Sequence, residues 1–83
     1  LEVIIEILKV IQNSRQIKPT LLLYASNLSP QMFKDYVDEL INKKFIQTED
    51  DGKGKKTFSL TKKGNEFLQE YKVIENFVEN FGL

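Results

Sequence analysis

The chain has 83 residues, and its 12 basic and 12 acidic side chains cancel to a formal net charge of zero. Hydrophobic residues make up 41% and charged residues 29%, a composition typical of one small globular domain and not of a disordered chain. Cysteine and histidine are both absent, which excludes disulfides, thiol catalysis, histidine-dependent nucleophiles and zinc sites built on thiolate or imidazole. We therefore expect neither an enzyme nor a bound cofactor or metal, and the lack of an apolar run of about 18 residues argues against a membrane span. Because the first residue is Leu1, we expect the start of the chain to be trimmed.

Residues 2–13 are predicted to form the first helix. Apolar side chains dominate this segment, and its polar residues recur at helical spacing as one narrow stripe, formed by Glu2, Glu6, Lys9 and Asn13. A helix with so narrow a polar stripe must be covered on more than one side. In a domain this small we expect a partner surface to supply part of that cover, over Val3, Ile7 and Val10.

A second and a third helix are predicted to follow. A polar linker leads to a short extended piece at 16–18, because the residue before a proline avoids the helical region. Pro19 can open a short helix that ends near Asn27. Ser29-Pro30 is a strong start signal for a third, amphipathic helix that reaches about Lys43. Two helices joined by so short a turn are a candidate helix-turn-helix.

The next segment alternates with the period of a strand. Residues 46–49 and 57–60 each alternate in polarity, and the loop at 50–54 between them is rich in aspartate and glycine. This pattern predicts a β-hairpin. Thr61 is then the expected N-cap of a last helix.

The order of these elements predicts the fold. A hairpin directly after a helix-turn-helix is the wing of a winged-helix domain. We therefore expect an α+β, mostly α chain: a winged helix-turn-helix over residues 1–61, and a long C-terminal helix for dimerisation over residues 62–83, in the same compact unit.

Two segments carry a family resemblance. Residues 24–29 have the pattern Tyr-x-x-Asn-Leu-Ser, and residues 60–68 have the pattern Leu-Thr-x-Lys-Gly-x-x-Phe-Leu. Between about Ile4 and Tyr71 the chain resembles small archaeal winged-helix proteins, namely the ten-kilodalton archaeal chromatin-protein family and related predicted transcriptional regulators. The resemblance implies DNA binding, and dimerisation through the C-terminal helix as an antiparallel coiled coil.

The sequence departs from that family pattern at three positions. Lys44 stands where the family often has a glycine at the helix end, which costs about 1 kcal/mol if the residue is left-handed. Leu21 and Asp35 occupy positions that are often basic in the relatives. These departures argue more against a high-affinity, sequence-blind chromatin role than against the fold.

The third helix is the candidate recognition helix. Its expected buried face is formed by Phe33, Tyr36, Val37 and Leu40, and its opposite face by Gln31, Lys34, Asp35, Asp38 and Asn42. The N-terminal part of such a helix meets base edges in the major groove. We expect contacts from Ser29, from Gln31 to adenine and from Lys34 to guanine or phosphate. The alternative is an ordinary solvated helix face.

The hairpin and the start of the last helix carry a basic cluster. Between residues 53 and 63 there are five lysines and no acid: Lys53, Lys55, Lys56, Lys62 and Lys63. Lysines on a hairpin tip can neutralise phosphates and release counterions. The last two also fall at a helix N-terminus, where free amides and the helix dipole favour an anion. The alternative for the hairpin lysines is that they only prevent edge-to-edge association.

The last helix presents a broad apolar stripe. Alternating steps of four and three residues connect Phe67, Tyr71, Ile74, Val78 and Phe81, and Phe77 widens the stripe. This is the seam of a coiled coil, so we expect these six residues to form a homodimer interface. The alternative folds the helix back over the first helix of the same chain.

These patterns together favour a homodimeric DNA-binding protein of the cytoplasm, associated with the nucleoid and acting as a transcriptional regulator on double-stranded DNA. One alternative is a winged-helix module that binds proteins, which the acidic Asp35 and Asp38 would support. Another is a nonspecific chromatin protein, which the zero net charge disfavours.

Overall fold

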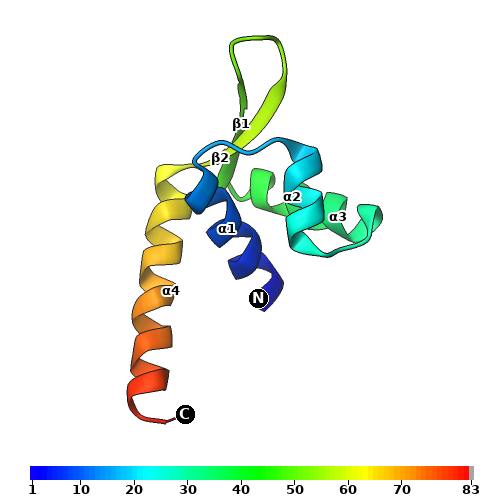
Figure 1. Cartoon of the computed structure of the whole chain (residues 1–83). Coiled ribbons are helices and arrows are strands. Elements are labelled where there is room, and N and C mark those ends of the chain that lie inside the picture. The colour runs from blue at the N-terminus through cyan, green and yellow to red at the C-terminus, as the bar shows by residue number, and fades with distance from the viewer. Residues whose placement is uncertain (83) are drawn as a thin grey trace.

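The computed structural model describes residues 1–82 and contains four helices and one hairpin (Figure 1). This order confirms the predicted mostly helical, winged helix-turn-helix fold. The elements in chain order are α1 (Glu2–Ser14), α2 (Pro19–Ser26), α3 (Pro30–Asn42), β1 (Ile46–Asp50), β2 (Lys56–Leu60) and α4 (Lys62–Asn80).

Helix α1 lies at the centre of the core. It contacts α2, β2 and α4, and its buried side chains are Ile5, Ile7, Leu8 and Ile11. Burying each of these side chains contributes about 1.5–3 kcal/mol to folding. The expectation that a partner must cover Ile7 is wrong, because the chain itself leaves that side chain only 1% exposed. Val3 and Val10 are half-buried against the same core.

The helix boundaries follow the capping signals in the sequence. Asn27 ends α2 in the left-handed conformation at φ 56°, and the Ser29 hydroxyl oxygen accepts a hydrogen bond from the Met32 amide at 3.3 Å. After α3, Lys44 takes a left-handed φ of 64°, as its position at the helix end predicted. Its amide donates to Ile41 and the next amide donates to Leu40, each at 3.0 Å, which is the hydrogen-bond pattern of a Schellman motif.

Strand β2 is paired on both of its edges. On one edge it runs antiparallel to β1, with Thr48 opposite Phe58. On the other edge Ile17 exchanges two backbone hydrogen bonds with Phe58, at 3.0 and 2.8 Å. The extended piece expected at 16–18 therefore pairs with the hairpin through one antiparallel β-bridge at Ile17. The polar Thr57 and Ser59 flank Phe58 on β2, so their side chains point to the opposite face, and both are also buried.

The start of α4 is bonded closely to the end of α3. The Thr61 hydroxyl accepts from the Gly64 amide at 3.0 Å and lies 2.6 Å from the carbonyl oxygen of Lys44, to which it donates. A Cβ atom on Gly64 would lie 2.0 Å from the carbonyl oxygen of Phe45, so only glycine allows this approach. The motif at residues 60–68 thus fixes the wing and α4 on the end of α3.

Within residues 1–82, none of the helices combines the length and the apolar character needed to cross a membrane. In the same range, the acidic side chains nowhere form a group of three or more that could hold a metal ion.

Candidate nucleic-acid interface

The outward face of α3 is fully exposed, as the sequence predicted. The side that points away from the core carries four polar residues at spacings of four, three and four, which places them in one stripe along the helix. These residues are Gln31, Asp35, Asp38 and Asn42. Val37 and Leu40 are buried on the opposite side, so the stripe is free to meet a ligand.

The polar side chains of this face are paired with one another. Gln31 donates from Nε2 to Oδ1 of Asp35 at 3.1 Å, and Lys34 Nζ forms an ion pair with Oδ2 of Asp38 at 2.8 Å. The hydrogen bond and the charge of Asp38, with a smaller contribution from the charge of Asp35, raise the pKa of Lys34 above its ordinary value. The shift favours the cationic form of Lys34, and its charge is partly neutralised by the carboxylate of Asp38.

Helix α3 carries more acids than bases. Lys34 is its single base, against the three acids Asp35, Asp38 and Glu39, so the helix has a formal charge of −2. Lys43 follows the helix and pairs with Glu39 at 2.8 Å. Long-range attraction to phosphate therefore has to come from other elements.

The hairpin loop is ordered by its two aspartates. One carboxylate oxygen of Asp50 accepts from the amides of Gly52 and Gly54 at 2.7 and 3.0 Å. One oxygen of Asp51 accepts from the amides of Lys53 and Lys55 at 2.8 and 3.2 Å. Both acids thus bond the loop backbone, and their hydrogen bonds hold the tip of the wing in one shape.

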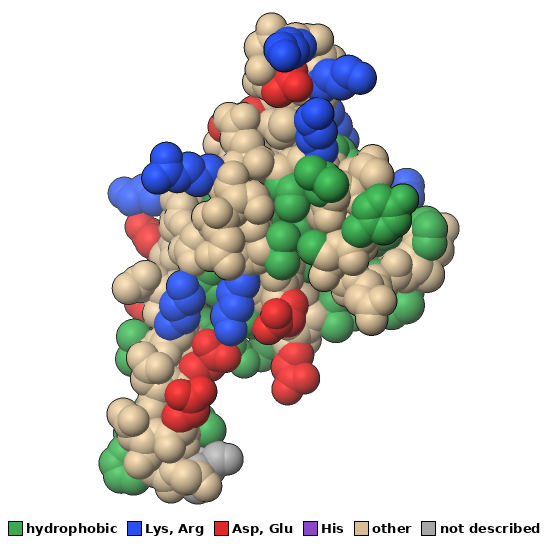
Figure 2. Space-filling model, in the orientation of Figure 1, with side chains coloured by type: hydrophobic (Ala, Val, Ile, Leu, Met, Phe, Trp, Pro, Cys, Tyr) green, Lys and Arg blue, Asp and Glu red, His purple; other side chains and the backbone are tan. Residues whose placement is uncertain are grey.

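The wing lysines remain available for a ligand. Lys53, Lys55 and Lys56 are all exposed, and within residues 1–82 none of them forms an ion pair. Figure 2 shows basic side chains (blue) gathered around the tip of the molecule that the hairpin forms, with acidic side chains (red) beneath them. The Lys56 amino group lies 5.2 Å from the centre of the Phe58 ring.

The two lysines at the start of α4 differ in their surroundings. The Lys62 side chain is 92% exposed and its amino group lies 4.0 Å from Glu66. The Lys63 amino group donates to the carbonyl oxygen of Lys43 at 2.9 Å and lies 4.9 Å from the Phe45 ring centre. The sequence pattern did not predict that Lys63 bonds the end of α3. The one signal available was its position next to Gly64.

Apolar side chains on the helix-turn-helix are also exposed, which the sequence reasoning missed. Leu21 and Tyr24 of α2 are 57% and 76% exposed, and Met32 of α3 is 47% exposed. Residues 21–24 are continuously apolar, so their periodicity does not reveal which of them face outward.

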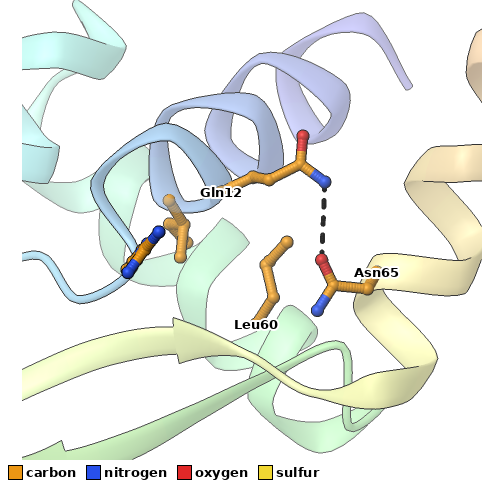
Figure 3. Close-up of a pocket in the computed structure, with 5 residues that line it drawn as sticks. Gln12, Leu60 and Asn65 are labelled. Carbon is orange, nitrogen blue, oxygen red and sulfur yellow. Dashed lines mark hydrogen bonds between the residues drawn. The ribbon is translucent and has the colours of Figure 1, made fainter.

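A shallow hollow lies where α1, β2 and α4 meet, lined by Ile11, Gln12, Arg15, Leu60 and Asn65. Gln12 donates from Nε2 to Oδ1 of Asn65 at 3.4 Å across it (Figure 3). Further along α4, Lys72 donates to Oε1 of the same glutamine at 2.9 Å. Gln12 therefore ties α1 to α4 at two points and helps to set the direction of α4.

The far end of α4 extends beyond the body of the domain (Figure 1) and exposes its apolar side chains. Of the six expected interface residues, Phe67 and Tyr71 are half-buried and pack against the chain's own core, with the Phe67 ring 4.9 Å from that of Phe45. The other four lie in the exposed stretch together with Val73, and their exposed fractions are 59% for Ile74, 58% for Phe77, 37% for Val78 and 69% for Phe81.

Residues 1–79 match the sequence model of the winged helix-turn-helix family. The chain belongs to this family. Among curated relatives, an uncharacterized protein of Methanocaldococcus jannaschii is 40% identical over 75 residues, which cover 89% of this chain and 71% of the relative. A second uncharacterized protein of the same organism is 32% identical over 72 residues, and the match spans 87% of this chain but only 31% of that protein.

Three solved structures share the winged helix-turn-helix fold of this chain. A MarR family transcriptional regulator from Silicibacter pomeroyi has a TM-score of 0.81 at 21% identity, over 96% of this chain and 56% of that one. Sso10a-2, a DNA-binding protein from Sulfolobus solfataricus, has a TM-score of 0.67 at 19% identity, over 98% and 86%. F93 from STIV, a winged-helix DNA-binding protein, has a TM-score of 0.66 at 22% identity, over 92% and 84%.

Proposed function

We propose that this winged helix-turn-helix protein binds double-stranded DNA as a homodimer and regulates transcription in the cytoplasm, at the nucleoid. The observation that carries the proposal is the wing, where three exposed lysines project from the hairpin and the two acids of its loop are bonded to backbone amides. Structures of the same fold described as a transcriptional regulator and as DNA-binding proteins support it.

In this proposal the wing supplies the affinity. Lys53, Lys55 and Lys56 lie along the sugar-phosphate backbone, and each phosphate they neutralise releases counterions. Lys62 lies at the base of the wing with its side chain 92% exposed and only a 4.0 Å ion pair to Glu66, so it adds a further contact. Lys63 adds less, because its amino group already bonds the end of α3.

Helix α3 supplies the readout. Its N-terminal half enters the major groove, as recognition helices of this kind do, with Gln31 and Lys34 next to base edges. The oxygen of Ser29 caps the helix, but its hydroxyl hydrogen can still donate to a phosphate oxygen.

In this proposal the exposed end of α4 forms the dimer interface. Pairing of two chains through Ile74, Phe77, Val78 and Phe81 removes an apolar surface from water, with Phe67 and Tyr71 at the edge of the contact. A two-fold dimer presents two wings and two recognition helices to successive half-sites on DNA.

The direct test is a fluorescence anisotropy titration of the protein on random-sequence duplex over a range of salt concentrations. We expect binding at low salt that weakens steeply as salt is added. Selection from a random duplex pool then separates a regulator, which enriches a sequence, from a nonspecific chromatin protein, which enriches none. Absence of binding at low salt would contradict the proposal.

A second candidate function is supported by the formal charge of −2 on α3. In this alternative the exposed face of α3 binds another protein and the domain is indifferent to DNA. It predicts an intact dimer by sedimentation together with no duplex binding at low salt.

A further inference from the structure

The stripe of α3 that points away from the core has an unusual composition. All four of its side chains, Gln31, Asp35, Asp38 and Asn42, are exposed and end in a carboxylate or a carboxamide. Lys34 lies at the edge of this stripe and is held by Asp38 at 2.8 Å. The chain has a single arginine, Arg15, and it follows α1. The stripe itself therefore offers oxygen acceptors and carboxamide donors, and none of its four side chains is a cation.

The base groups that suit such a stripe are few. In the major groove, adenine presents its N6 amino group and cytosine its N4 amino group, and these are the hydrogen-bond donors there. Carboxamides pair with the N6 and N7 atoms of adenine, and carboxylates accept from N4 of cytosine. Guanine presents only the acceptors N7 and O6, and thymine presents O4 and a methyl group, so a carboxylate is left unpaired opposite either base.

Building on the proposed DNA binding, we propose that α3 reads duplexes that place an adenine or cytosine amino group at the positions facing Asp35 and Asp38. The two carboxylates reject sequences that place guanine or thymine at those positions, because every base pair carries one amino group in the major groove and only its position distinguishes sequences. On a wrong sequence the two carboxylates find no base amino group and lie close to phosphates, which weakens binding. On a matching sequence the amino groups satisfy them. Selectivity then comes from a repulsive element as much as from an attractive one.

The internal pairs of α3 strengthen this selectivity. Lys34 gains little from a nonspecific phosphate, because that contact competes with its ion pair to Asp38. Gln31 is likewise bonded to Asp35 at 3.1 Å and has to exchange that partner for a base. A sequence that places amino groups next to the carboxylates compensates for both exchanges, whereas a sequence that places guanine or thymine there compensates for neither.

The first experiment compares the wild type with the double variant Asp35→Asn/Asp38→Asn, which removes two charges and keeps the side-chain shapes. Affinities are measured by anisotropy for random duplex and for the duplex selected by the wild type. We expect affinity for random duplex to rise about tenfold and the ratio of specific to random affinity to fall about tenfold, as two lost unfavourable contacts imply. The matched control is Glu2→Gln/Glu70→Gln, which changes the net charge equally at exposed positions on α1 and α4.

The second experiment removes single amino groups from the selected duplex, by placing purine for adenine or 2-pyrimidinone for cytosine. Loss of a contacted cytosine amino group should weaken the wild type about tenfold and the Asp→Asn variant less. A new selection with the variant should shift the preference at that position from cytosine to adenine, because asparagine pairs with adenine.

The outcomes separate this inference from the function on which it rests. If the wild type binds no duplex at low salt, the proposed DNA binding fails, and this inference with it. If the wild type binds duplex but the Asp→Asn variant changes affinity and selectivity no more than the control, DNA binding stands and the inference is overturned. A selected site in which removal of each adenine or cytosine amino group leaves wild-type binding unchanged would also overturn it.

Discussion

The Lys63 amino group lies 2.9 Å from the carbonyl oxygen of Lys43, so the first turn of α4 is bonded directly to the end of α3. The same amino group lies 4.9 Å from the centre of the Phe45 ring. A lysine that the sequence pattern assigned to phosphate binding alone therefore helps to hold α4 against the end of α3.

Replacing Lys63 should lower stability more than it lowers DNA affinity. Lys63→Met removes the hydrogen bond and the contact with Phe45, and we expect a loss of about 1 kcal/mol in the free energy of unfolding. Urea titration measures this loss. Lys62→Met, at the neighbouring exposed position, is the control and should leave stability within about 0.5 kcal/mol. Equal effects of the two variants on stability would show that the bond to Lys43 contributes nothing.

Gly64 should tolerate no side chain. The added Cβ of Gly64→Ala would meet the carbonyl oxygen of Phe45 at 2.0 Å, and the backbone has to move to relieve the clash. We expect a loss of about 3 kcal/mol, measured as a lower melting temperature by circular dichroism. Gln69→Ala, at an exposed position of the same helix, should change the melting temperature little. A Gly64→Ala variant as stable as the wild type would contradict the packing described for the start of α4.

The acids of the wing should act through hydrogen bonds as well as through charge. Asp50→Asn keeps an oxygen acceptor for the amides of Gly52 and Gly54, whereas Asp50→Ala removes it. We expect the alanine variant to increase fast backbone motion in the loop, measured by ¹⁵N relaxation, and the asparagine variant to keep the loop ordered. If alanine and asparagine leave the loop equally ordered, the carboxylate does not organise it.

The dimer should depend on the exposed end of α4. Ile74 is 59% exposed in the single chain, so Ile74→Asp should leave the fold intact and yield monomers in sedimentation experiments. Asn76→Asp adds the same charge two residues further, on the opposite side of the helix, and should leave the dimer unchanged. Two results would argue against a seam in this stretch: a wild type that sediments as a monomer, or an Ile74→Asp variant that remains a dimer.

Features set by neighbouring residues were predictable from the sequence. Ser29-Pro30 and Thr61 cap their helices as expected, and Lys44 takes the left-handed conformation that its position at a helix end predicts. The element order followed from such local signals, because capping and strand alternation act over a few residues.

Features that depend on distant residues were not predictable in the same way. The cover over Ile7 comes from elements far along the chain, and the bond from Lys63 to Lys43 spans 20 positions. In α2 the continuous apolar run hides that Tyr24 faces outward. In each case tertiary packing decides, and a single sequence does not record which segments meet.

The central claim, that the wing holds phosphates, is tested most directly by the salt dependence of duplex binding. Lys55→Gln/Lys56→Gln is compared with the wild type and with Gln69→Glu/Asn80→Glu, which lowers the net charge equally on exposed positions of α4. We predict that the wing variant weakens binding to all duplexes alike. It should flatten the slope of log affinity against log salt by about four, since the dimer carries two wings, loses four lysines, and each lost phosphate contact removes about 0.9. A slope for the wing variant no flatter than that of the α4 control would contradict the account.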